Sequence, residues 1–234
     1  MTGNAPKRVI VRGLGPSLAT QNISDPLADP VIELHGPNGS LIQRNDDWKD
    51  SQRAAIEHST LAPKDDKEAA IIATLPPGIY TAIVSGKNNT GGTALVEIYD
   101  LTPAGDSTLA NISTRGYSAG GEKVLIGGFM LKGGGSSHVV VRGLGPSLTD
   151  AGISHALADP TLEVRNANGD AIGFNDNWKD DPLEAAAVTA TGLAPKKAKE
   201  AALALDLPAG DYTVIVAGKA SAAGIALVEV YNLQ

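Results

Sequence analysis

The chain has no cysteine and few aromatic residues, which make up 4% of its 234 residues. The absence of cysteine excludes disulfide bonds and thiolate metal sites. With so few aromatic rings, any core must consist mainly of Val, Ile, Leu and Ala. No apolar run is long enough to cross a bilayer, so we expect no membrane insertion. Residues 1–3 also lack the basic region and apolar run of a secretory signal peptide.

Basic side chains are also too few and too dispersed to form a binding stripe. The chain has 19 Lys and Arg against 26 Asp and Glu, which gives a net charge of −7. Divided at Pro103, both halves are mildly acidic, with 9 basic and 12 acidic residues before that point and 10 and 14 after it. Because clustered Lys and Arg dominate phosphate binding, the sequence predicts no nucleic-acid partner.

One sequence pattern occurs twice along the chain. Residues 8–18, RVIVRGLGPSL, return as HVVVRGLGPSL at 138–148, an offset of 130. LADP at 27–30 and NDDWKD at 45–50 return at the same offset, the latter as NDNWKD. LPPGIYT at 75–81 returns as LPAGDYT at 207–213, so two residues are inserted before it. Self-similarity of this kind indicates a duplicated structural unit.

The duplicated unit is longer than the matched segments. Residues 104–137 occur once and hold two strand-like runs, 111–116 and 123–131. We therefore expect a first repeat at 1–103 that lacks its N-terminal strands, with Met1 a start cut into a longer array. The second repeat, 104–234, includes the 111–131 block. The first repeat should then carry an open strand edge near residues 9–11, through which it self-associates or joins neighbouring repeats.

The local patterns favour strands with a short helix in each repeat. Alternating or β-branched runs lie at 139–142, 161–165, 171–174, 201–207, 212–217 and 225–231. Asp181-Pro182 followed by Glu184 is typical of a helix start, and residues 51–59 are the counterpart. We predict an all-β chain of two tandem jelly-roll-like β-sandwich repeats, each with one short helix.

Two resemblances extend this prediction. Residues 159–176 and 207–216 resemble the pre-peptidase C-terminal domains of bacteria, which are β-sandwich accessories of secreted hydrolases. The whole unit more closely resembles a tandem repeat of very large secreted bacterial proteins. In that repeat, segments like NISTRG (111–116), GGF (127–129) and VRGLGPSL (141–148) recur. This resemblance implies an extracellular or cell-surface location and a structural or adhesive role.

The residues expected in an enzyme do not recur. None of the four His residues is repeated, so no His-centred site can exist in both copies. Ser17 and Ser147 lack the context of a nucleophile. GLGPSL begins like a dinucleotide fingerprint, but Leu18 and Leu148 stand where the third Gly is needed. We therefore expect a non-catalytic protein.

The repeated Asn/Asp-rich loops have two interpretations. Oxygen-rich side chains suit Ca²⁺, or they form turns that end a strand and cap the next helix; we favour the turns. The candidate Ca²⁺ ligands are Asn45, Asp46, Asp47 and Asp50 in the first loop, and Asn175, Asp176, Asn177 and Asp180 in the second. No cofactor is otherwise predicted.

Each of these loops also holds a Trp. Trp48 and Trp178 either plug one end of a sandwich or, if exposed, stack on sugar rings. The alternative to a structural or adhesive module is therefore a carbohydrate-binding module that binds polysaccharide and is stabilised by calcium.

One acid and one base recur inside apolar strands. Arg12 and Arg142 follow three apolar residues, and Glu97 and Glu229 lie within equally apolar runs. An unpaired charge in such a strand is costly. We therefore predict two structural ion pairs, Arg12–Glu97 and Arg142–Glu229.

Overall fold

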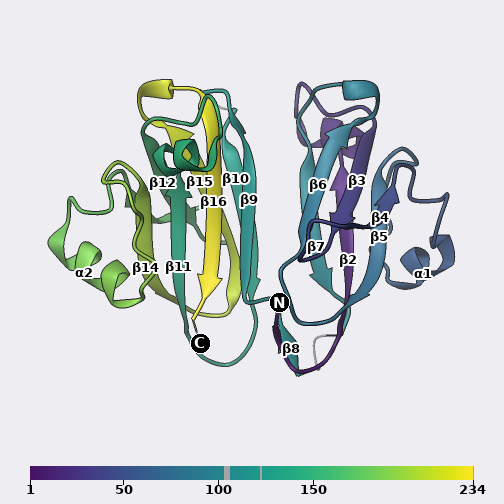
Figure 1. Cartoon of the computed structure of the whole chain (residues 1–234), viewed down its shortest axis with the longest axis horizontal. Coiled ribbons are helices and arrows are strands. Elements are labelled where there is room, and N and C mark those ends of the chain that lie inside the picture. Colours follow the sequence, from purple (N-terminus) through teal and green to yellow (C-terminus); the bar gives the residue numbers. More distant parts are fainter. Residues whose placement is uncertain (103–105, 122, 234) are drawn as a thin grey trace. The chain divides into compact units, whose positions relative to one another are not determined.

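The computed structural model describes residues 1–102, 106–121 and 123–233 and contains two compact units, Met1–Leu109 and Ala110–Gln234 (Figure 1). We call them unit 1 and unit 2. The predicted boundary, residue 103, lies outside the described residues. The units divide six residues later because β8 (Ser107–Thr108) pairs with β1 (Thr2–Gly3) and so belongs to unit 1.

Unit 2 is a sandwich of two antiparallel four-stranded sheets. One sheet has the order β14-β11-β16-β9 and the other β10-β15-β12-β13. The strands are β9 (Asn111–Ser118), β10 (Leu125–Leu131), β11 (Ser137–Leu144), β12 (Pro160–Arg165), β13 (Ala171–Asn175), β14 (Ala201–Leu207), β15 (Gly210–Gly218) and β16 (Gly224–Asn232). Apart from the β12–β13 hairpin, successive strands alternate between the two sheets, which gives a jelly-roll-like arrangement. The all-β prediction is confirmed.

Unit 1 has a smaller sandwich of two three-stranded sheets, ordered β5-β2-β7 and β4-β3-β6. Its strands are β2 (Lys7–Leu14), β3 (Pro30–His35), β4 (Leu41–Asn45), β5 (Ala69–Leu75), β6 (Thr81–Gly86) and β7 (Leu95–Asp100). They correspond in order and pairing to β11 through β16. Among the described residues of unit 1, no strand takes the place that β9 or β10 has in unit 2.

The open edge of unit 1 is not where the sequence pattern suggested. Residues 9–11 lie in β2, which pairs with β5 on one side and β7 on the other. In unit 2, β9 pairs with β16 and β10 pairs with β15. The strands left without an outer neighbour are therefore their counterparts, β7 and β6. The prediction was wrong because neighbours in sequence, such as β10 and β11, belong to different sheets.

Alternation along the strands builds two apolar layers in each unit. Val9 and Val11 of β2 face the core between the sheets, whereas Ile10 faces the outer layer. There Ile10 packs with Trp48 and with Ile56 of α1 (Arg53–His58). The period of two along a strand places neighbouring residues on opposite faces, so a strand buried on both sides reads as a continuous apolar run.

The helix of unit 2 starts as its sequence predicts, whereas that of unit 1 does not. In α2 (Pro182–Ala190), the Asp181 side chain accepts hydrogen bonds from the amides of Leu183 and Glu184. In α1 the preceding residue is Gln52, which has a φ of 56° and makes no capping bond. Its side-chain amide instead bonds both backbone groups of Ile72 in β5.

Candidate functional site

A buried glutamate holds the repeated GLGPSL turn in unit 1. Glu68 directly precedes β5 and is fully buried. Its Oε1 accepts hydrogen bonds from the amides of Gly15 and Ser17, at 3.1 and 3.0 Å, and from the Ser17 hydroxyl. Its Oε2 accepts from the amide of Asp65. The loop thus binds an anion, as glycine-rich turns do, but that anion is the protein's own carboxylate.

The same arrangement recurs in unit 2. Glu200 is fully buried, and its Oε1 accepts from the amides of Gly145 and Ser147 at 3.3 and 2.8 Å. Its Oε2 accepts from the amide of Lys197. Because these backbone amides already donate to the glutamate, they are not available to bind a nucleotide phosphate. Sequence reasoning missed both glutamates, although KEAA at 67–70 recurs as KEAA at 199–202.

The second glycine of the turn permits a close approach of two chain segments. A Cβ at Gly15 would lie 2.0 Å from the carbonyl oxygen of Leu27, and one at Gly145 would lie 2.1 Å from that of Leu157. These contacts are too short for any side chain. The glycine is therefore required by packing against the LADP segment, and the phosphate-loop explanation is unnecessary.

The two tryptophans are buried, so the alternative interpretation, exposed rings that stack on sugars, is wrong. Trp48 and Trp178 are 5% and 6% exposed. Their indole N–H groups donate to the carbonyl oxygens of Asp65 and Lys197, both at 3.1 Å. Each ring closes the outer apolar layer between the sheet and the helix. Burial removes the ring faces that a sugar would need.

Asn45 and Asn175 join the two sheets of their units. Asn45 ends β4 in one sheet, and its Oδ1 accepts a hydrogen bond of 2.9 Å from the amide of Ala70 in β5 of the other sheet. Asn175 does the same for Ala202 at 3.1 Å. With their amide oxygens used in this way, neither Asn fits the role of Ca²⁺ ligand predicted for it.

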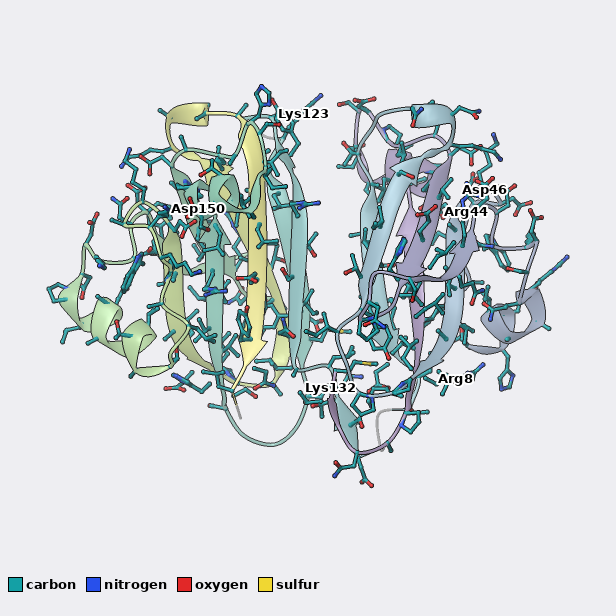
Figure 2. The ribbon with its side chains drawn as sticks, viewed as in Figure 1. Arg8, Arg44, Asp46, Lys123, Lys132 and Asp150 are labelled. Atoms are coloured by element: carbon teal, nitrogen blue, oxygen red, sulfur yellow. The ribbon has the colours of Figure 1, made fainter. Side chains whose placement is uncertain are left out.

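The carboxylates of the first loop gather with a residue that sequence reasoning did not include. Oxygen atoms of Asp29, Asp46 and Asp47 lie within 4.8 Å of one another, with Asp46 directly after β4 (Figure 2). Asp50 is not in this cluster. Asp29 belongs to the LADP segment, whose recurrence at 157–160 was the available signal.

A lysine already compensates this acidic cluster. Lys87 Nζ lies 2.7 Å from Asp46 Oδ2 and 3.9 Å from Asp29 Oδ2. The hydrogen bond to Asp46 raises the pKa of Lys87. Burial raises the pKa of Asp47, and Lys87 opposes that shift. The positive charge here is supplied by the chain itself.

The second loop has fewer carboxylates. Lys219 bonds Asp176, which raises the pKa of Lys219, and Lys199 contacts Asp159 at 3.1 Å. Asn177 stands where unit 1 has Asp47, and its amide donates to Asp180. Within the described residues, these groups form no cluster of three carboxylates like that of unit 1. Calcium binding stays the alternative interpretation of both loops.

Both predicted ion pairs are present, with their strands adjacent. Arg12 faces Glu97 across β2 and β7, and Arg142 faces Glu229 across β11 and β16. In each pair Arg Nε donates to the carboxylate at 2.8 Å, and Nη2 donates to the same oxygen. One further guanidinium nitrogen in each pair donates to a backbone carbonyl after the helix, that of Leu61 or Leu193.

A tyrosine completes each ion pair. The guanidinium carbons of Arg12 and Arg142 lie 5.1 Å from the ring centres of Tyr99 and Tyr231, which is cation–π distance. The Tyr99 hydroxyl donates to Glu97 at 2.9 Å. Burial, followed by the neighbouring Glu97, raises the pKa of Tyr99. Arg, Glu and Tyr therefore act together to fasten the segment after the helix to the sheet.

Comparisons with known proteins do not assign a function. No family model and no curated protein match the chain. Among solved structures it is similar to the major capsid protein P2 of bacteriophage PM2, with 9% identity, a TM-score of 0.28, and coverage of 98% of this chain and 87% of that one. The STIV major capsid protein gives 12% identity, a TM-score of 0.29, and coverage of 98% and 88%.

The described residues include no helix that is both long and apolar enough to cross a membrane.

Proposed function

We propose that this chain is a non-catalytic structural module of an extracellular tandem-repeat protein. The observation that carries the proposal is how the recurring polar side chains are used. Glu68, Asn45 and Arg12 bind backbone groups or partner side chains of unit 1. Their counterparts Glu200 and Asn175 do the same in unit 2. Side chains shared by both copies thus serve the fold, which is typical of a scaffold.

In this proposal the two units are two copies of one jelly-roll-like repeat, the first without two of its strands. The repeated segments and the shared sheet order support this view. The extracellular location rests on the resemblance of the NISTRG, GGF and VRGLGPSL segments to repeats of large secreted bacterial proteins. The burial of Trp48 and Trp178 disfavours the carbohydrate-binding alternative.

Localisation and activity together test the proposal. An antibody against the purified chain should label intact cells of the source organism, and surface proteolysis should remove the label. The purified chain should cleave no peptide, ester or glycoside in a substrate panel, and polysaccharide gels should not retard it. A purely intracellular signal, or turnover lost on substitution of a single residue, would overturn the structural assignment.

A further inference from the structure

The inner face of β7 is uncovered in unit 1. Val96 and Ile98 are 36% and 40% exposed, whereas their counterparts Val228 and Val230 in β16 are 2% and 8% exposed. Both counterparts belong to the main core of unit 2. The residues are similarly apolar in the two units. The difference is that β16 has β9 on its outer side, whereas among the described residues no strand pairs with the outer side of β7.

The inner face of β6 is uncovered in the same way. Its residues alternate between exposed and half-buried, whereas Tyr212, Val214 and Val216 of β15 are buried. In unit 2 the Tyr212 ring stacks on Phe129 of β10 with ring centres 5.2 Å apart. Tyr80, the counterpart of Tyr212, is only half-buried.

A surface hollow of about 380 Å³ marks the gap. It is lined in part by Leu27, Val84 and Ala94. In unit 2 the counterpart of Val84 is Val216, which pairs with Leu125 of β10. The counterpart of Ala94 is Ala226, which pairs with Gly116 of β9. The hollow therefore lies where unit 2 places residues of its two extra strands.

Unit 2 also shows the register that an added strand pair would take. Leu131, the last residue of β10, pairs with Gly210. In unit 1 the Met1 backbone already makes the equivalent pair with Gly78, through Met1 N to Gly78 O at 2.8 Å and Gly78 N to Met1 O at 3.0 Å. A strand in the β10 register would run along β6 and end at the position of Met1.

The polar groups at the edge fit the same occupant. In unit 2 Ser113 of β9 faces Glu229, with its hydroxyl 3.4 Å from Glu229 Oε1. The corresponding oxygen in unit 1, Glu97 Oε1, accepts from the Tyr99 hydroxyl, as Glu229 Oε1 also accepts from that of Tyr231. A β9-type strand would bring a serine to this carboxylate and an apolar residue, like Ile112, to the level of Ile98.

We propose that β6 and β7 receive a two-stranded segment of the β9–β10 type from an adjoining copy of the repeat, joined at the position of Met1. Backbone ladder bonds supply affinity in strand addition, and alternate side chains supply specificity. The proposal deepens the structural role proposed above by naming the module's partner.

The test is a chain in which a second copy of residues 110–130 is fused directly before Met1, so that Met1 takes the place of Leu131. Each unit holds one Trp, so Trp48 fluorescence reports unit 1 and Trp178 fluorescence reports unit 2. We expect amides of β6 and β7 to exchange at least tenfold more slowly. The melting temperature of unit 1 should rise by roughly 5 °C or more.

The matched control carries the same fusion with Leu125→Asp and Phe129→Asp in the added segment only. It should give no protection, because in unit 2 Leu125 and Phe129 pack in the core beside Val216 and Tyr212, and a charged group there is costly. An unchanged Trp178 transition verifies that unit 2 remains folded in both chains. Equal exchange rates in the fused, control and original chains would overturn the proposal.

A separate peptide of residues 110–131, added to the original chain, distinguishes the source of the strands. Protection by the fusion and weak or no protection by the peptide supports a segment joined at Met1. Protection by the peptide but not by the fusion would overturn entry at Met1. These readouts are independent of cellular location and of turnover, so the partner and the structural role can fail separately.

Discussion

At the scale of single residues, Glu200 offers the sharpest test of the turn. Replacing Glu200 with Gln should lower the free energy of unfolding of unit 2 by about 2–3 kcal/mol, because an amide group would direct an N–H₂ toward backbone donors and charge-assisted bonds would be lost. Urea unfolding followed by Trp178 fluorescence, in a Trp48→Phe background, measures this. Exposed Asp211→Asn is the control and should cost less than about 0.5 kcal/mol. Equal effects would contradict the role of Glu200.

The two ion pairs should contribute different amounts to the free energy of unfolding of their units. The side chain of Glu229 is 10% exposed and that of Glu97 is 20% exposed. Arg142→Met leaves the more buried carboxylate unpaired and should destabilise unit 2 by roughly 3 kcal/mol, against about 2 for Arg12→Met in unit 1. Unit-specific Trp fluorescence in urea separates the two values.

A double variant separates loss of the pair from the cost of an orphaned charge. Arg142→Met combined with Glu229→Leu should recover a substantial part of the loss, since apolar replacement of both partners removes the unpaired charge. If the double variant is as unstable as the sum of the single variants, the pair is not energetically coupled.

Calcium should have little effect on the natural chain. Lys87 bonds Asp46 and lies close to Asp29, so a cation must displace an ammonium group. We expect melting temperatures in calcium and in chelator to agree within about 1 °C, and Lys87→Gln to make unit 1 calcium-stabilised by mass action. Lys219→Gln in unit 2, where Asn177 replaces a carboxylate, should show no such gain. A clear calcium shift in the unmodified chain would favour a resident metal.

Some of the site was readable from the sequence, and the rest was not. The pairing of Arg12 with Glu97 followed from the cost of an unpaired charge in an apolar strand. The role of Asn45 could not be predicted, because its side-chain oxygen suits a metal as well as a backbone amide. Only the arrangement of the two sheets shows that the amide of Ala70 is its partner. The burial of Trp48 depends on α1 and on the carbonyl of Asp65, which only the tertiary structure brings together.

At the scale of elements, the start of α2 depends on Asp181. Asp181→Ala removes the acceptor for the amides of Leu183 and Glu184 and should cost about 1 kcal/mol. The Trp178 transition in urea reports this loss, because Trp178 packs in the same layer as Val188 of α2. Asp180→Ala is the neighbouring control, since Asp180 caps no helix amide, and should cost clearly less. No difference between the two variants would show that the cap does not stabilise α2.

Strands were more predictable than helix ends. Residues 201–207 were predicted as a strand and form β14 with the same bounds. The run alternates, with Leu203, Leu205 and Leu207 at every second position, and it ends before Pro208. The first helix was expected over 51–59 and spans Arg53–His58. It lacks the Asp-Pro start of α2, so Gln52 bonds β5 instead and the helix begins later.

At the scale of the whole chain, the sequence revealed that a strand pair is unmatched but not which strands lose their neighbours. The number of copies of each strand can be counted from the repeated segments of the sequence alone. Edge assignment requires the pairing of β9 with β16 and of β10 with β15. Those contacts join residues that are 79 to 120 positions apart, and no local periodicity encodes them.

The same difference predicts that the units unfold separately and that unit 1 unfolds first. Unit 1 has six sandwich strands against eight in unit 2 among the described residues. Its Val96 and Ile98 remain about one-third exposed or more, so their burial contributes less, at roughly 25 cal/mol per Å² of apolar area.

In urea, Trp48 fluorescence should therefore change at a lower midpoint than Trp178 fluorescence. The slope of the unit 1 transition should also be shallower, because the slope scales with the area exposed on unfolding. Single-Trp chains, Trp178→Phe for unit 1 and Trp48→Phe for unit 2, give the two curves without overlap. Coincident midpoints and slopes would mean that the two units unfold as one cooperative body, and that the uncovered edge of unit 1 carries no energetic penalty.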